Sequence, residues 1–148
     1  MFSVFFSGVD FRRFVKRVDV RVVEDFGVEV FVLGDFLFGE RGGVVFPLVV
    51  ESNGEVLDRL GVVVVDRGAV PRIVSGADVM RPGVVEVVGD FSAGSVVVVR
   101  DEVHKKPVAV GRALYDADVI RGMERGRVVE NLHYVDDRFW KLALRIKV

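Results

Sequence analysis

The chain has 148 residues, of which 51% are hydrophobic and 29% are charged, and its formal net charge at pH 7 is −1. This size is sufficient for one compact unit or two small domains with a hydrophobic core. The absence of cysteine excludes disulfide bonds, zinc fingers and thiol catalysis. No apolar run approaches the ~18 residues of a membrane-spanning helix, and the N-terminus lacks the basic start of a signal peptide. We therefore expect a cytoplasmic protein without membrane contact.

The distribution of polar residues is uneven. Glutamine and threonine are absent, and asparagine occurs only at Asn53 and Asn131; a low amide content is typical of thermophile proteins. Residues 1–60 carry a net charge of −3, whereas residues 61–148 carry +2. The near-neutral total argues against a general polyanion-binding protein, but the second half has enough basic excess for a local anion-binding surface.

The first sixty residues are expected to form a small domain with one helix and a β-meander. The helix is expected over residues 11–18, because its apolar residues recur at helical spacing after Asp10, a favourable N-cap. Strands are expected at residues 3–6, 20–23, 28–33, 36–38 and 44–46, with turns at Gly34-Asp35 and Arg41-Gly42-Gly43. Between Pro47 and Leu60 the pattern does not distinguish a helix from a strand with a loop, although Asn53-Gly54 is a strong turn signal.

From residue 61 onward, short strands are separated by glycine or proline at nearly every break, which is typical of a small barrel. A short helix capped by Asp116 or Asp118 is expected after the strand at residues 108–114. The alternation of apolar and basic residues over 140–148 predicts a half-buried final strand. The expected fold class is α+β: a small α/β-meander domain, followed by a β pseudo-barrel of five or six strands with two short helices. Strands are expected at residues 62–65, 84–88, 95–100, 108–114 and 140–148, and an exposed hairpin tip at 104–107.

Residues 65–83 form the most informative stretch. Val70, Ile73 and Val74 share one face of a short helix, because they are spaced i, i+3 and i+4. Gly76 stands where a left-handed cap ends such a helix. Arg81-Pro82-Gly83 predicts a type II turn in which glycine takes a positive φ. The expected unit is strand, turn, short helix, glycine-rich turn and strand.

The sequence offers little for catalysis. Histidine occurs only at His104 and His133, and no metalloprotease, nucleophile-elbow, Walker or dinucleotide-binding motif is present. We interpret His133 as a partly buried residue whose ring nitrogen bonds to backbone, and Asp78 as a polar turn former. We expect no enzymatic activity, no cofactor and no metal.

The 65–83 stretch resembles the opening of a PUA domain, the small RNA-binding module first described in pseudouridine synthases and archaeosine transglycosylases. The end of the chain is similar to the C-terminal motif of the malignant-T-cell-amplified-sequence family of translation factors and their archaeal relatives. Further similar segments are Gly89-Asp90-Phe91, Ala93-Gly94-Ser95 with the following valines, Ala109-Val110-Gly111-Arg112-Ala113-Leu114, Val129-Glu130-Asn131-Leu132-His133-Tyr134 and Phe139-Trp140. Ser95 departs from the aspartate that PUA domains often carry there, which bears on the stability of that turn.

The resemblance implies a pre-PUA domain at residues 1–60, a PUA domain at 61–148, and an RNA-binding groove around the first helix. Glycines let a backbone approach a ligand, and arginines bind phosphate in a bidentate manner. The residues alone favour a different interpretation, in which the glycines serve turns and Arg67, Arg72 and Arg81 pair with nearby carboxylates. The site expected from the resemblance comprises Arg67, Gly68, Arg72, Ser75, Gly76, Ala77, Asp78, Arg81, Gly83, Gly111 and Arg112.

The resemblance also implies a function. The ligand would be a structured RNA, either a tRNA acceptor end or ribosomal RNA, and the role would be on the small ribosomal subunit in translation initiation, re-initiation or recycling. A translation-factor partner of the density-regulated type is a further expectation. Two alternatives stay open: a protein-interaction module, and an accessory subunit of a separate RNA-modifying enzyme.

Overall fold

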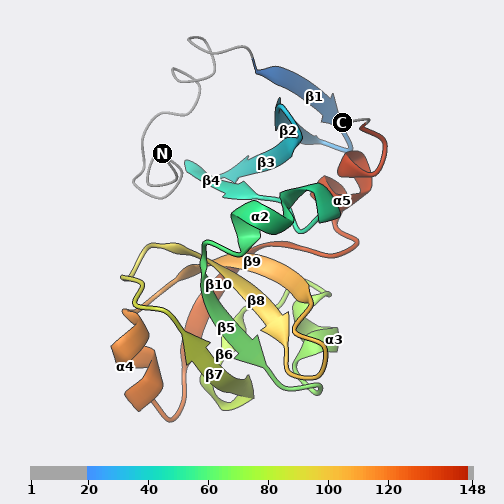
Figure 1. Ribbon diagram of the computed structural model, residues 1–148. Coiled ribbons are helices and arrows are strands. Elements are labelled where there is room, and N and C mark those ends of the chain that lie inside the picture. The colour runs from blue at the N-terminus through green and yellow to red at the C-terminus, as the bar shows by residue number, and fades with distance from the viewer. Residues whose placement is uncertain (1–19, 147–148) are drawn as a thin grey trace.

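The computed structural model describes residues 20–146, which form two β-sheets connected by short helices (Figure 1). The strand expected at residues 3–6 and the helix expected at 11–18 lie outside the described residues. The larger sheet is curled and lies at the opposite end of the molecule from the smaller one (Figure 1). Strands dominate the described part of the chain and short helices accompany them, in agreement with the predicted α+β class.

The first sheet is an antiparallel meander of four strands in chain order. Residues with positive φ close its three turns, as tight hairpins require; they include Gly27, Gly34, Gly42 and Gly43. The strands and turns predicted within residues 20–46 are thus confirmed. The four strands are β1 (Arg21–Asp25), β2 (Val28–Leu33), β3 (Phe36–Arg41) and β4 (Val44–Pro47).

The segment that the sequence left undecided forms two short helices, η2 (Glu51–Asn53) and α2 (Gly54–Leu57). The turn predicted at Asn53-Gly54 is wrong, because Gly54 begins a helix. Asn53 is fully buried, and its amide group donates to the carbonyls of Leu37 and Leu48 while its oxygen accepts from the Leu37 N–H. Its side chain therefore satisfies backbone groups of the first sheet instead of a turn.

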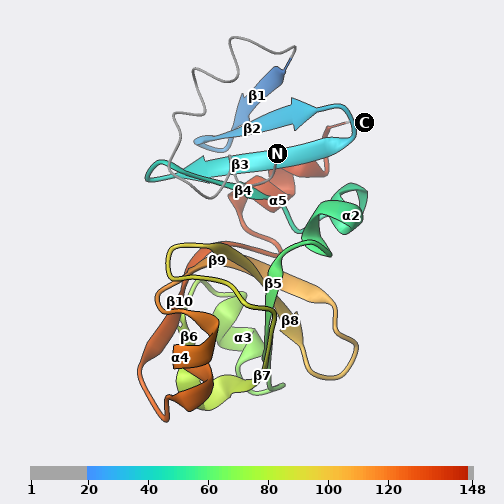
Figure 2. The same ribbon diagram turned by 60° about the vertical axis from the view of Figure 1, so that its left-hand side comes forward.

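The second sheet has six strands in the order β6-β10-β9-β8-β5-β7, all antiparallel neighbours except the parallel pair β5 and β8. Figures 1 and 2 both show its helices α3 and α4 on the side away from the first sheet. The predicted pseudo-barrel of five or six strands with two short helices is confirmed, although β6 and β10 were not among the strands expected from the sequence. The elements are β5 (Gly61–Val65), α3 (Val70–Ile73), β6 (Val79–Met80), η3 (Arg81–Gly83), β7 (Val84–Val88), β8 (Val96–Asp101), β9 (Pro107–Ala113), α4 (Ala117–Gly122) and β10 (Arg127–Tyr134).

Gly83 does not adopt the positive φ predicted for it. Arg81-Pro82-Gly83 forms one turn of 3-10 helix, and Gly83 is absent from the positive-φ glycines of the described residues. A Cβ atom at this position would lie 3.1 Å from the Cβ of Ala69. Close packing of η3 against the start of α3, rather than turn conformation, therefore accounts for the glycine.

The predicted final strand is wrong, because residues 138–143 form a helix, α5 (Arg138–Ala143). Asp137 caps it by accepting a hydrogen bond from the Trp140 N–H at 2.9 Å, as aspartate does at a favourable N-cap. Phe139, Leu142 and Ala143 are buried, and their i, i+3, i+4 spacing places them on one face of the helix. The helix contacts β2, so the end of the chain packs against the first sheet.

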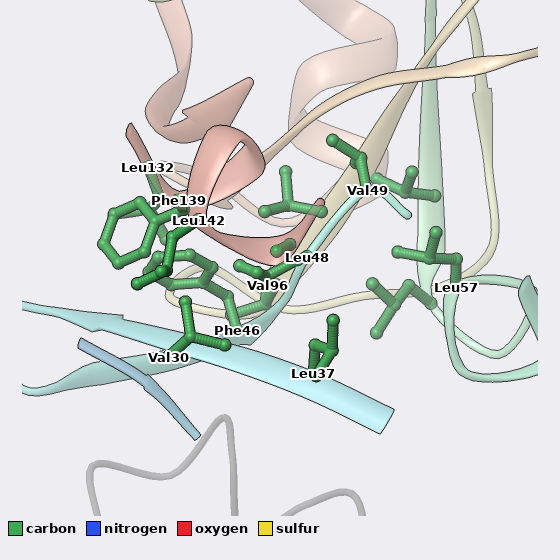
Figure 3. Packing of buried hydrophobic residues seen from close by; sticks show 14 of the residues in the cluster. Val30, Leu37, Phe46, Leu48, Val49, Leu57, Val96, Leu132, Phe139 and Leu142 are labelled. Atoms are coloured by element: carbon green, nitrogen blue, oxygen red, sulfur yellow. The ribbon is translucent and has the colours of Figure 1, made fainter. Parts of the chain in front are cut away.

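The second sheet is buried on both faces. Alternate residues of its central strands point in opposite directions: Val96, Val98 and Val110 belong to the core shared with the first sheet, whereas Val97 and Val99 belong to the core beneath α3 and α4. Figure 3 shows the shared core, where residues of β2, β4, β8, β10 and α5 meet. At its centre the rings of Phe46 and Phe139 pack edge to face with centroids 5.2 Å apart. This shared core joins the two sheets.

Candidate functional site

The predicted site begins where β5 leads into α3. The Asp66 carboxylate accepts from the Ala69 N–H at 2.9 Å, and the Asp66 N–H donates to the Gly83 carbonyl at 2.9 Å. These two bonds hold the start of α3 against the turn that follows β6. Pro71 lies in the first turn of α3, where a missing N–H costs little. Arg67 and Gly68 are exposed on the connecting turn.

Gly76 ends α3 in the left-handed cap that its position predicted. Its φ is +102°, and the Ala77 N–H reaches back to the Arg72 carbonyl at 3.0 Å. The exposed Ser75 hydroxyl donates to the Pro71 carbonyl at 2.9 Å. A Cβ atom at Gly76 would lie 3.5 Å from the Tyr134 hydroxyl. The cap therefore lies directly over Tyr134 at the end of β10.

The loop after α3 is anchored to β10 by two polar side chains. Asp78 accepts from the Asn131 N–H at 2.8 Å and forms an ion pair with Arg127 at 3.0 Å. The Asn131 amide group donates to the carbonyls of Ile73 and Ala77, both at 2.9 Å. Asp78 thus has a long-range anchoring role that the interpretation as a local turn former missed.

The three arginines of the predicted site have different environments. Arg67 and Arg72 are exposed, and neither forms an ion pair within residues 20–146. Arg81 is half-buried and donates to the carbonyls of Ile120, Val84 and Arg121 at 2.7, 3.1 and 3.3 Å. These bonds use three of its five N–H donors. Arg81 therefore holds η3 against the end of α4.

The alternative in which these arginines pair with nearby carboxylates is not observed. Asp78 pairs with Arg127, and Glu86 lies 4.0 Å from Lys105. Asp66 caps the turn before α3. The roles of Arg127 and Asn131 as partners in this region were not predicted; the signal available for Asn131 was its rarity, since the chain has two asparagines.

The structure separates the last two predicted site residues, Gly111 and Arg112. Gly111 is buried in β9, where a Cβ atom would overlap the Glu130 carbonyl and the Val129 side chain. Arg112 points to the opposite face of the sheet, as adjacent strand residues do, and forms an ion pair with Glu130 at 3.2 Å. Asn131, next to Glu130 on β10, faces α3 instead. Arg112 therefore does not join the cluster around α3.

His133 has the structural role that the sequence suggested, in a more buried form. It is fully buried, and its Nε2 accepts from the Val49 N–H at 2.9 Å. This bond leaves Nδ1 to donate to the Asp137 carboxylate at 2.8 Å.

No group of three or more metal-ligating side chains occurs in the described part of the chain. None of the helices between residues 20 and 146 is long and apolar enough to span a bilayer.

The second sheet is curled and six-stranded, and its first strand is followed by a one-turn helix and by a glycine-containing loop anchored to β10. This arrangement defines a PUA-type module. The chain belongs to the PUA domain family, whose model matches residues 61–135. The resemblance seen in the sequence is confirmed. The matched region ends before α5, the helix that packs against the first sheet.

Relatives extend this result over most of the chain. An uncharacterized protein of Methanocaldococcus jannaschii is 35% identical over 140 residues, covering 93% of this chain and 85% of that protein. A crystal structure of a hypothetical protein from Pyrococcus horikoshii matches with a TM-score of 0.69 and 33% identity, covering 95% of this chain and 89% of that one. Translation machinery-associated protein 20 of Schizosaccharomyces pombe is 36% identical over 84 residues, covering 54% of this chain and 46% of that protein. The alignment thus spans less than half of the fission yeast protein.

Proposed function

We propose that the protein binds RNA without catalysis, through α3 and the loops on either side of it. The observation that carries the proposal is the pair Arg67 and Arg72, exposed beside the glycine turns of an anchored loop and without an ion pair in the described structure. Guanidinium groups in this state can bind phosphate in a bidentate manner. Membership of the PUA domain family supports RNA as the source of that phosphate.

The individual site residues take two kinds of role in this proposal. Arg67, Gly68 and Arg72 would contact RNA, together with the exposed backbone around Ser75, Gly76 and Ala77. Asp78, Arg81, Gly83 and Gly111 would act indirectly, because their contacts hold the loop, η3 and β9 in place. Arg127 joins the site through its ion pair with Asp78, since its side chain remains 54% exposed.

The ligand that we propose is a structured RNA, a tRNA acceptor end or ribosomal RNA, and the setting is translation in the cytoplasm. The support is the name of the fission yeast relative, a translation machinery-associated protein. Binding to the small ribosomal subunit and to a translation-factor partner belongs to the same proposal. We further propose residues 1–60 and 61–148 as two domains, although α5 of the second packs on the sheet of the first.

Two alternatives differ from this proposal, one in the role of the barrel and the other in the partner. In a protein-interaction module, an exposed apolar surface on the first domain would carry function. The described phenylalanines there are instead mostly internal: Phe31, Phe38 and Phe46 are at most 2% exposed, and Arg145 lies 4.8 Å from the ring of Phe26. An accessory subunit of an RNA-modifying enzyme would share the RNA site and differ in its partner.

The test is the binding of labelled tRNA, with and without its single-stranded 3′ end, over a salt series. Arg67→Ala/Arg72→Ala should weaken binding by about tenfold or more and reduce the salt dependence, because phosphate contacts release counterions. Arg59→Ala/Arg145→Ala is the matched control, since it removes two exposed, ion-paired arginines elsewhere. Equal weakening in both variants would count against a site at α3, and negligible binding of wild type to tRNA and to small ribosomal subunits would exclude the proposed function.

A further inference from the structure

A second basic site lies where the β3–β4 turn meets β9 and β10. A hollow of about 280 Å³ there is several times larger than the ~30 Å³ share of a liquid water molecule, so it admits a group of several atoms. We call it the Arg41–Arg112 hollow. Its lining residues are Arg41, Gly42, Val44, Arg112, Glu130, Asn131 and Leu132.

The first sheet contributes Arg41 to this hollow. Arg41 is exposed at the end of β3, and its Nη1 donates to the Leu132 carbonyl of β10 at 2.9 Å. The turn that follows consists of Gly42 and Gly43, with φ of +56° and +84° and open space beside both. The Gly43 N–H donates to Glu40 at 2.9 Å, which holds the turn. The guanidinium is therefore fixed at the junction of the two sheets beside an open turn.

The second sheet contributes Arg112. Its side chain is 40% exposed and lies 3.2 Å from the Glu130 carboxylate on the neighbouring strand. One such contact engages part of a guanidinium that carries five N–H donors. Arg41 likewise makes a single polar side-chain contact with the described residues. Both arginines are held in position and keep donors for a ligand.

The charges around the hollow favour an anion. Two guanidiniums and the single carboxylate of Glu130 leave a net positive charge in the lining. Glu40, the other carboxylate at this turn, accepts from the Gly43 N–H and lines a separate groove that Arg41 also lines. Phosphate oxygens match the planar fork of arginine. We propose that the Arg41–Arg112 hollow binds a phosphate of the RNA backbone, so that both sheets contribute to one RNA surface.

This inference rests on the proposed function, because it places a second contact of the same RNA. β6 pairs with β10 only from Arg127 to Val129. Beyond that point side chains bond the edge of β10: Asp78 accepts from Asn131 N–H and Arg41 donates to the Leu132 carbonyl. Arg127 and Leu132 are about 17 Å apart along a strand, at ~3.3 Å per residue. An RNA strand that crosses this edge would reach from Arg127 to Arg41.

The test compares Arg41→Ala/Arg112→Ala with Arg59→Ala/Arg145→Ala in tRNA binding over a salt series. We expect the first variant to bind about tenfold more weakly, with a salt slope smaller by about one, as loss of one phosphate contact requires. Glu130→Gln should tighten binding, because it removes the carboxylate that competes with phosphate for Arg112. Arg41→Lys keeps the positive charge and should bind tRNA more tightly than Arg41→Ala. That difference would show that weaker binding comes from the lost charge and not from misfolding.

A titration with inorganic phosphate tests the Arg41–Arg112 hollow independently of RNA binding. In NMR titrations, phosphate should shift the amide signals of Gly42, Gly43 and Asn131 in the wild type and leave them unchanged in Arg41→Ala/Arg112→Ala. If Arg67→Ala/Arg72→Ala weakens tRNA binding while Arg41→Ala/Arg112→Ala matches its control, the hollow is not a contact and the proposed function stands. If the wild type binds no RNA, the proposed function fails, and absent phosphate shifts would then overturn the anion site as well.

Discussion

Gly111 shows how a single residue can be required by packing alone. It lies opposite Asn131 at the point where the register of β10 against β9 shifts. A Cβ atom there would overlap a backbone carbonyl, that of Glu130, which cannot rotate away as a side chain can. The glycine that the sequence suggested for an RNA groove is thus explained by the pairing of β9 with β10.

Replacing this glycine should therefore destabilise the fold without any ligand. We expect Gly111→Ala to lower the free energy of unfolding by about 3 kcal/mol, the upper part of the range for overpacking a filled site. Gly122→Ala is the matched control, because nothing lies within 4 Å of a Cβ atom at the end of α4. Urea denaturation measures both variants. A similar midpoint for the two would contradict the packing argument.

The structure perturbs the ionisation of Asp101. It is the last residue of β8, at the start of the β8–β9 hairpin tip, and accepts hydrogen bonds from the N–H groups of Val103, His104 and Lys106. The backbone bond from His104 is the main cause that lowers the pKa of Asp101 below its ordinary value. Since the folded state favours the charged carboxylate, this residue stabilises the fold at pH values above its unfolded pKa.

The corresponding prediction concerns acid stability. As the pH falls through the lowered pKa of Asp101, its contribution should disappear. Asp101→Asn should therefore show a shallower loss of stability than the wild type between pH 5 and about pH 2. Urea denaturation at each pH measures the slope, with Asp90→Asn as an exposed control. Identical slopes for wild type and Asp101→Asn would show that the turn does not favour the charged form.

At the scale of elements, the sequence predicted what local geometry determines. Hairpin turns at Gly34 and Gly42 and the cap at Gly76 were predicted because positive φ is a local property. The sequence could also have predicted that Gly111 and Arg112 face opposite sides of the sheet, because neighbouring strand residues alternate between the two faces. This was not predicted, because the resemblance gave only the order of the residues along the chain and not the face of the sheet on which each side chain lies.

The elements that the sequence missed depend on distant partners. The alternation in residues 140–148 fitted a strand, but α5 forms because Asp137 caps it and Phe139 enters the core that both sheets share. Asn53 likewise gave a turn signal and instead bonds Leu37, sixteen residues away. Neither outcome follows from a local pattern, since in both cases tertiary contacts decide between two conformations of similar propensity.

For the whole molecule, His133 joins the parts that the shared core brings together. It lies on β10, accepts from Val49 after the first sheet, and donates to Asp137 at the start of α5. Its ring also packs against Phe46 and Phe139, with centroids 5.9 and 5.8 Å away. Because Asp137 in turn accepts from the Tyr134 and Trp140 N–H groups, one buried network joins three elements.

This network predicts that the two sheets unfold together. His133→Ala should cost about 4 kcal/mol, because it leaves a cavity and an unpaired Val49 N–H. His133→Gln, which can still present an oxygen to Val49, should recover part of that loss. The measurement is urea denaturation followed by Trp140 fluorescence, which reports on α5, and by far-ultraviolet circular dichroism, which reports on both sheets. In the wild type the two transitions should coincide.

The decisive observation is whether the two probes separate. With the core of Figure 3 drawn from both sheets, loss of His133 should shift both transitions to lower urea by the same amount. Separate transitions in the wild type would mean that the first sheet and the barrel are independent units, each with its own stability. The Arg41–Arg112 hollow could not then present a fixed site, because its two arginines come from different sheets. Coincident transitions would instead support a rigid surface that can position RNA from α3 to the β3–β4 turn.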